Sequence, residues 1–240
     1  MIQPINIERK KLFEQVAAHI EAQIVDGHLK PGDLLPPERD LQIAFGVGRP
    51  AIREALITLQ KAGLVEIANG ARARVQRATA SHIFSGMAPA VRQMLSTPEG
   101  QREFQGARLF FECGLARNAA RNATPEEISG LKAALDKNEA AIGDTPAFIA
   151  TDIAFHLELA KIGHNSIFLA LHDQISEWLR EQRVVTLAAN NQEQIAYAAH
   201  KAIYEAIAKR DPDGAEGAML AHMQQLSQTF WRQVSHEGVA

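Results

Sequence analysis

The sequence has a single cysteine, Cys113, among its 240 residues. An internal disulfide framework is therefore excluded. No apolar run approaches the roughly 20 residues that a membrane-spanning helix requires. The N-terminal segment MIQPINIERKK contains no apolar core of a secretory signal. Together these absences predict a protein of the cytoplasm that has no membrane partner.

Strand patterns are missing from most of the chain. From Ala80 onward the apolar residues recur at helical spacing, and capping sequences such as Thr124-Pro125-Glu126-Glu127 separate the segments. Neither an internal repeat nor a low-complexity tract interrupts this pattern. The sequence predicts a bundle of about seven helices, which cover 81–95, 101–122, 125–142, 145–162, a segment that starts at 165 or 166, 191–210 and 211–235.

No charge sign dominates the chain, whose formal net charge is −3. The two parts differ, however. Residues 1–79 contain 11 Lys and Arg against 9 Asp and Glu, whereas the remainder contains 14 against 19. A basic N-terminal part joined to an acidic domain favours a nucleic-acid reader in the first part. Because its charge excess is small, we expect one copy to bind DNA weakly and a homodimer to be needed.

A helix-turn-helix pattern lies between Glu38 and Lys61. A short helix over 38–45 is followed by the turn Gly46-Val47-Gly48 and by a longer helix over 49–61. Arg49 and Arg53 are four residues apart, so both lie on one exposed face near the start of the second helix. In a helix-turn-helix, that region contacts base edges in the major groove. The pattern therefore predicts a DNA reader.

A hairpin follows the second helix. Residues 64–68 read as a strand, Asn69-Gly70 is a strong hairpin turn, and residues 71–76 form the returning strand. Arg72 and Arg74 alternate with apolar residues, so both point to one face. The prediction is a winged helix-turn-helix with a basic wing. The alternative is a small helical hairpin that makes protein contacts, in which case the arginine pairs and the wing are coincidental.

Polar residues on apolar helical stripes point to a metal site in the bundle. Asp152 and His156 are four residues apart on one stripe, and His200 and His222 each lie on another. A buried carboxylate needs a partner, which a divalent metal bound also by three imidazoles would supply. Zinc is expected first, with nickel or manganese as alternatives. The alternative interpretation is that the aspartate and the three histidines are core residues whose hydrogen bonds are satisfied within the protein. His164 and His172 are expected at the surface or at helix ends.

The first third of the chain resembles the DNA-binding domain of GntR-type regulators. The resemblance rests on the runs PPERD, FGVGRPAIREAL and KAGLV. It implies that Arg39, Arg49 and Arg53 contact operator DNA and that Gly70 is the wing tip. Gly48 departs from the family, in which Ser or Thr is usual, and a glycine cap costs only a few tenths of a kcal/mol relative to serine. The lost hydroxyl could change half-site preference.

Residues 101–231 resemble the helical FCD effector domain of FadR-type members of this family. The resemblance rests on DIAFH at 152–156, HKAI at 200–203 and His222. It implies a metal at these four positions and a small organic acid at the open coordination positions. Arg108 matches the effector-binding arginine of the family, and Arg183 is a second candidate. The alternative for Arg108 is an internal salt bridge to Glu112.

The runs GVGRPAIREAL, NGARARV, SGMA, ARLFFE and DPDGAEGAM resemble a sialic-acid-responsive subgroup of these repressors. The resemblance implies N-acetylneuraminate as effector, with lactate, gluconate or a similar acid as the alternative. A metal-dependent enzyme is disfavoured for two reasons. Four protein ligands are expected, whereas a catalytic zinc usually has three, and the sequence contains no H-E-x-x-H segment. The expected fold is mostly α, with a winged helix-turn-helix domain over 1–77 and an FCD-like bundle for metal, effector and dimerisation over 78–240.

Overall fold

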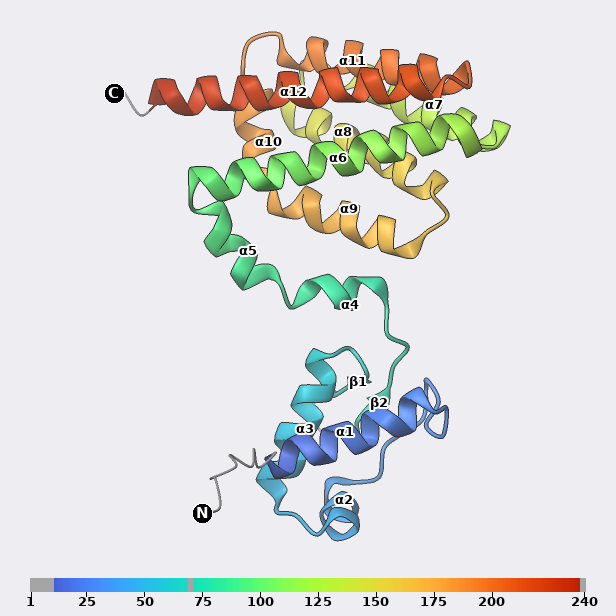
Figure 1. Cartoon of the computed structure of the whole chain (residues 1–240), viewed down its shortest axis with the longest axis vertical. Coiled ribbons are helices and arrows are strands. Elements are labelled where there is room, and N and C mark those ends of the chain that lie inside the picture. The colour runs from blue at the N-terminus through green and yellow to red at the C-terminus, as the bar shows by residue number, and fades with distance from the viewer. Residues whose placement is uncertain (1–10, 69–70, 238–240) are drawn as a thin grey trace, which may run out of the picture. The chain divides into compact units, whose positions relative to one another are not determined.

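The computed structural model describes residues 11–68 and 71–237. By its internal contacts the chain divides into two compact units, Met1–Gly86 and Met87–Ala240 (Figure 1). The sequence predicted a boundary after residue 77, whereas this division places residues 78–86 with the first unit. The prediction of a mostly helical chain is confirmed, with one small sheet in the part that the structure describes. Within that part, no helix is long and apolar enough to cross a membrane.

The first unit contains the helix-turn-helix. Its helices are α1 (Leu12–Val25), α2 (Glu38–Phe45), α3 (Arg49–Lys61) and α4 (Ala80–Ser85). Gly46 ends α2 in the left-handed region, at φ 62°, which a residue with a Cβ rarely adopts. Gly48 precedes α3 and makes no side-chain capping bond. The turn between α2 and α3 therefore depends on Gly46. The core of the unit is formed by Val16, Ala17, Ile20, Leu35, Leu41, Ile52, Ala55, Leu56, Leu59, Val65, Ala73 and Val75.

The wing is shorter in regular structure than the sequence predicted. Strand β1 (Val65–Glu66) pairs antiparallel with β2 (Arg74–Val75), with Val65 opposite Val75. The predicted strands over 64–68 and 71–76 are thus too long. The reason is that part of the returning segment pairs with residues 33–35 instead, since Leu35 N–H donates to the Ala73 carbonyl at 2.8 Å. The predicted turn residues Asn69 and Gly70 lie outside the described residues.

The second unit is a bundle of helices. They are α5 (Ala88–Leu95), α6 (Pro98–Asn122), α7 (Pro125–Ala140), α8 (Thr145–Ile162), α9 (Ser166–Trp178), α10 (Arg180–Leu187), α11 (Gln192–Ala208) and α12 (Pro212–Glu237). The capping box predicted at the start of α7 is present, because Thr124 Oγ1 accepts from Glu127 N–H and Glu127 accepts from Thr124 N–H. Helices α6 and α12 run side by side in Figure 1, and Gln105 of α6 is hydrogen-bonded to Ser227 of α12.

One helix prediction in this region is wrong, and one helix was missed. The expected helix over 81–95 is broken into α4 and α5, which end and begin on either side of Gly86 and Met87. Pro89, near the start of α5, lacks an N–H group and would clash with the carbonyl four residues earlier if the helix were continuous. The short helix α10 was not predicted. The chain leaves the helical conformation at Leu179, but leucine is a good helix former, so the sequence gives no sign that α9 ends there.

Candidate metal centre and effector cavity

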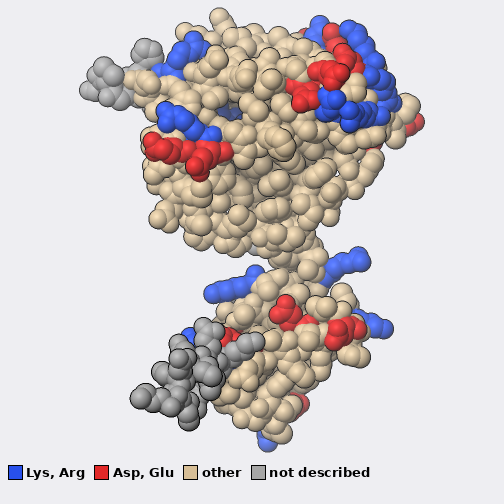
Figure 2. Space-filling model, in the orientation of Figure 1, with Lys and Arg blue, Asp and Glu red and all other residues tan. Residues whose placement is uncertain are grey.

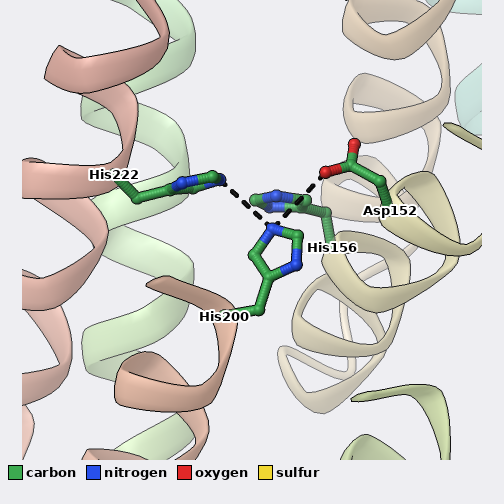
Figure 3. Close-up of side chains that lie close together, drawn as sticks. All are labelled: Asp152, His156, His200 and His222. Atoms are coloured by element: carbon green, nitrogen blue, oxygen red, sulfur yellow. Dashed lines mark hydrogen bonds and ion pairs between the residues drawn. The ribbon is translucent and has the colours of Figure 1, made fainter. Parts of the chain in front are cut away.

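Four side chains from three helices meet in the core of the second unit. Asp152 and His156 come from adjacent turns of α8, His200 comes from α11 and His222 from α12 (Figure 3). Each offers one ligand atom, and these atoms all lie within 4.8 Å of one another. All four residues are buried, with 3% or less of each residue's surface exposed. The structure thus brings together the four residues that the sequence singled out.

His200 is held in one orientation by its neighbours. Its Nδ1 lies 2.9 Å from Asn138 Oδ1, and the amide nitrogen of Asn138 donates to Thr151 Oγ1, which fixes the amide. Because the amide oxygen accepts, Nδ1 carries the proton and the Nε2 lone pair is available. That Nε2 lies 3.2 Å from His222 Nε2 and 3.4 Å from Asp152 Oδ1. The lone pair of His200 therefore faces the other members of the cluster.

His156 is oriented in the same way by a carboxylate. Its Nδ1 lies 3.0 Å from Glu112 Oε2, so Nδ1–H donates to Glu112 and Nε2 is left as an acceptor. His156 Nε2 and His222 Nδ1 are buried and have no hydrogen-bond partner among the described residues. Buried polar nitrogens are normally paired. An unpaired Nε2 that lies beside three other potential ligand atoms fits a metal ligand. A metal-bound histidine usually donates the N–H of its other ring nitrogen to a carboxylate or a carbonyl oxygen, as His156 and His200 do here.

The charge states of the cluster also fit a divalent cation. Burial lowers the pKa of His200 to about 3 and lowers the pKa of His222 well below its ordinary value, so both imidazoles are neutral at neutral pH. Burial opposes ionisation of Asp152, but Arg183 and His200 lower its pKa overall. One carboxylate and three imidazoles form a nitrogen and oxygen set of the kind that binds zinc and related metals.

A small cavity of about 40 Å³ adjoins the cluster. Asp152 forms part of its wall and accepts from Arg183, whose Nε lies 2.8 Å from Asp152 Oδ2. Arg108 also lines the cavity, and its Nε lies 3.6 Å from Glu112 Oε1. The salt bridge considered for Arg108 is thus present, and the same side chain still faces the cavity. The lining residues are Gln105, Arg108, Asp152, Leu179, Gln182, Arg183, Thr186, Leu187, Met223, Leu226, Ser227 and Phe230.

Both arginines of the cavity carry unused hydrogen-bond donors. Arg108 Nη2 and Arg183 Nη1 are buried and have no partner in the part of the chain that the structure describes. The pKa of Arg183 is lowered by burial and by the nearby Arg108. Two guanidinium groups with free, buried N–H groups can bind an anion, since a planar carboxylate can accept from an arginine fork.

Polar groups without charge form another part of the cavity wall. Gln105 Oε1 accepts from Ser227 Oγ at 2.8 Å and from Trp231 Nε1 at 2.9 Å, and Gln105 Nε2 donates to Gln182 Oε1 at 2.8 Å. These residues come from α6, α10 and α12, and Gln105, Gln182 and Ser227 line the cavity. Amide and hydroxyl groups of this kind can exchange hydrogen bonds with the hydroxyl groups of a ligand.

Glu112 and Asn138 were not predicted as site residues. Asn138 lies on the apolar stripe of α7 with Leu131 and Leu135, so the rule applied to the histidines would have found it. Glu112 was considered only as a partner of Arg108. The expectation that His172 is a surface or capping residue is wrong, because it is 1% exposed on the inner face of α9. His164 is exposed and contacts Glu127 at 3.1 Å.

The arginines predicted to contact DNA are exposed in the first unit. Arg49 and Arg53 at the start of α3 both contact the carboxylate of Glu38, at 3.0 and 3.3 Å. Those guanidinium groups lower the pKa of Glu38 and remain more than half exposed. Arg39 and Arg72 are exposed, whereas Arg74 Nη1 donates to the Gly32 carbonyl at 2.6 Å. The predicted role of Gly70 falls outside the described residues.

Comparisons with known proteins match both units. Residues 12–75 match the bacterial regulatory proteins of the gntR family, and residues 103–225 match the FCD domain. The chain is 42% identical over 228 residues to the HTH-type transcriptional repressor NanR of Klebsiella aerogenes, which covers 94% of this chain and 87% of that protein. It is 41% identical over 233 residues to NanR of Cronobacter sakazakii, which covers 96% of this chain and 89% of that protein.

Solved structures show the same fold. A GntR protein of Streptococcus agalactiae has a TM-score of 0.64 at 23% identity, over 90% of this chain and 99% of its own. McbR/YncC of E. coli has a TM-score of 0.53 at 20% identity, over 94% of this chain and 100% of its own. The relatives are regulators and not enzymes, as the sequence predicted. This chain belongs to the gntR family of bacterial regulatory proteins and is a DNA-binding transcriptional regulator with an FCD effector domain.

Proposed function

We propose that this regulator is a repressor of a sugar-acid catabolism operon and that a small carboxylate bound beside a metal ion controls its DNA binding. The observation that carries the proposal is the placement of two guanidinium groups, each with a buried and unpaired N–H group, on a cavity that shares Asp152 with the metal cluster. An acid can bind the metal and an arginine together only where the two sites adjoin.

The metal in this proposal is zinc, with nickel or manganese as alternatives. Asp152, His156, His200 and His222 would hold it, and the metal would supply positive charge and open coordination positions for the acid. Glu112 and Asn138 support the set, since they orient His156 and His200. A metal that only cross-links the bundle is the second possibility, and it predicts that removal of the metal unfolds the domain whether or not acid is present.

The effector in this proposal is N-acetylneuraminate, an acid with many hydroxyl groups. The motifs over both domains resemble the sialic-acid-responsive subgroup, and the relatives named NanR are repressors. The amide and hydroxyl wall of Gln105, Gln182 and Ser227 suits such a ligand better than lactate, which offers one hydroxyl group. At about 40 Å³, the cavity is far below the roughly 300–1,000 Å³ of ligand pockets, so binding requires it to expand.

DNA recognition is proposed for the exposed arginines of the first unit. Arg49 and Arg53 would release the Glu38 carboxylate and contact base edges of the DNA. The sugar-phosphate backbone or a groove of the DNA would be contacted by Arg39, Arg72, Arg74 and Gly70. Glu38 holds both guanidinium groups near the start of α3 before DNA arrives. These are exposed ion pairs and are worth little in stability, so a phosphate or base can displace them.

A homodimer is proposed as the binding form, and α6 offers a surface for the second copy. Phe110 is 83% exposed at the middle of this helix. Gly106 and Gly114 lie one turn before and after it, and an added Cβ at either would meet no atom within 4 Å. On the α5–α12 unit in Figure 2, the drawn face carries charged residues at its two ends and uncharged residues between them. A two-fold related copy that packs on α6 would cover Phe110.

The proposal is tested by metal analysis and thermal shift of the purified protein with N-acetylneuraminate, lactate and gluconate. We expect bound zinc and a rise in Tm with N-acetylneuraminate, and we expect His200→Ala to lose both. His164→Asn is the control, because it removes an exposed histidine of the same domain and asparagine tolerates the φ of 48° at that position. Wild-type protein that binds neither zinc nor any of the acids would contradict the proposal.

A further inference from the structure

Glu112 contacts both halves of the proposed site. Its side chain lies on α6 and is 2% exposed. One carboxylate oxygen, Oε2, lies 3.0 Å from Nδ1 of His156, and the other, Oε1, lies 3.6 Å from Nε of Arg108. His156 belongs to the metal cluster and Arg108 lines the cavity. A single buried carboxylate therefore joins a metal ligand to a residue that would bind the acid.

The local geometry explains why one side chain reaches both partners. Arg108 and Glu112 are one turn apart on α6, so their side chains lie next to each other on the same face. His156 approaches from α8 and donates through Nδ1, which leaves its Nε2 directed at the cluster. Each carboxylate oxygen of Glu112 therefore faces a partner, Oε2 the imidazole of His156 and Oε1 the guanidinium group of Arg108. Its charge is thus held in place by these partners.

We propose that Glu112 is a positioning residue that couples metal binding at His156 to the presentation of the Arg108 guanidinium group in the cavity. The inference rests on the proposed function, because it needs a metal and an acid at these two places. A metal on Nε2 would make Nδ1–H of the same ring a stronger donor, and Glu112 would then be held more firmly. The anchored carboxylate keeps Arg108 Nε in contact and leaves Nη2 free for the acid.

The coupling runs in both directions. If the metal improves acid binding through Glu112, then the acid must improve metal binding by the same factor. Asp152 provides a second connection, since it contacts both His200 and Arg183. Each arginine of the cavity is therefore connected to the metal cluster by one carboxylate, Arg108 by Glu112 and Arg183 by Asp152. Asp152 is itself a proposed metal ligand, whereas Glu112 is not. Glu112 can be changed while all four ligands remain.

The experiment compares wild type with Glu112→Gln in two titrations. Zinc affinity is measured by competition with a chromophoric chelator, and N-acetylneuraminate affinity is measured by calorimetry at saturating zinc. We expect zinc binding to weaken by about 10- to 100-fold, and acid binding at saturating zinc to weaken by about 10-fold because Arg108 loses a charged partner. Glu193→Gln is the matched control, since Glu193 is also buried and bonds only Gly143 N–H and Thr145 Oγ1 in the described contacts.

The outcomes separate this inference from the proposed function. Wild-type protein that binds neither zinc nor acid overturns the proposed function. Wild-type protein that binds both, with Glu112→Gln unchanged in acid affinity at saturating zinc, overturns the coupling alone. If Glu112→Gln does not fold, Glu112→Asp decides by the same two titrations. That variant keeps the charge but has a side chain one methylene shorter. We expect it to bind the acid more weakly than wild type does. Acid affinity equal to that of wild type would contradict the coupling.

Discussion

Arg183 Nε lies 2.8 Å from Asp152 Oδ2, while the other oxygen of that carboxylate faces His200 at 3.4 Å. Both Arg183 and Asp152 are about 95% buried. The carboxylate therefore stands between the metal cluster and the cavity. In the proposed mechanism, an arriving acid would meet a guanidinium group that Asp152 already orients, so the metal site and the acid site would act as one unit.

The first prediction concerns Arg183. In Arg183→Met, we expect zinc to be retained and affinity for N-acetylneuraminate at saturating zinc to fall by about 10- to 100-fold, because a buried charged hydrogen bond to the acid is lost. Metal analysis measures the retained zinc, and calorimetry on zinc-loaded protein measures the acid affinity. Arg180→Met is the control, since Arg180 lies on the same helix but is exposed and pairs with Glu177. Equal affinity in wild type and Arg183→Met would show that this arginine does not bind the acid.

The second prediction concerns DNA reading. Arg53→Ala should weaken binding to an operator, selected by the purified protein from a random duplex library, by about 1–3 kcal/mol, because a base contact is lost. Fluorescence anisotropy at fixed salt measures the effect. Lys61→Ala is the control, because Lys61 is exposed at the other end of α3, about 18 Å from its start. A loss of the same size for both variants would indicate a general charge effect only.

The third prediction is acid sensitivity of the metal-free protein. The folded-state pKa of His200 is about 3 and that of His222 is also lowered, whereas the unfolded value is 6.5. The unfolded state therefore binds more protons below pH 6.5, and the stability that the neutral histidines provide is fully present above that pH. The free energy of unfolding should fall by about 1.4 kcal/mol per pH unit through His200 as the pH decreases from 6.5 toward 3, and His222 should add to this loss in the same direction.

Urea unfolding between pH 8 and pH 5 measures this slope. Asp152 and Glu112, whose pKa values are also lowered, add to the loss only below about pH 4.5. The double substitution of His200→Asn and His222→Asn should flatten the profile between pH 6.5 and 5. Zinc should delay the loss to lower pH, because the bound metal competes with protons for the imidazoles. A flat profile in the wild-type protein would show that the histidines are not buried in neutral form.

The fourth prediction concerns the proposed dimer. Phe110→Glu should raise the dimer dissociation constant by at least about 100-fold, because burying an unpaired charge replaces burial of an aromatic ring. Sedimentation equilibrium measures the constant. Ile195→Glu on α11 is the control, since it places the same charge at another exposed apolar position, which is 44% exposed. A dimer of unchanged affinity in Phe110→Glu would place the interface elsewhere.

Local sequence pattern was enough to find the helix-turn-helix and the four members of the metal cluster. The reason is that each signal is short in range: Arg49 and Arg53 share a helix face, and Asp152 and His156 are one turn apart. His200 and His222 were found because each is a polar residue on an apolar stripe. That His200 Nε2 lies 3.2 Å from His222 Nε2 depends on the packing of α11 against α12, which no local pattern specifies.

The supporting residues show the limit of such reasoning. Glu112 is 44 residues from His156 in the chain and meets it only because α6 packs on α8. His172 carries no sequence signal that separates a buried histidine from a surface one, and it was misplaced. The break between α4 and α5 was missed although Pro89 lies in the interior of the expected helix, because the apolar spacing was followed and the proline, which belongs in the first turn of a helix, was passed over.

The most direct test of the account is the affinity of zinc-loaded protein for its selected operator, measured with and without saturating N-acetylneuraminate. The account predicts that the acid changes operator affinity by at least about 5-fold, that operator DNA changes acid affinity by the same factor, and that His200→Ala binds the operator but does not respond to the acid. Identical operator affinity with and without the acid, in wild-type protein that demonstrably binds it, would contradict control of DNA binding from the metal site.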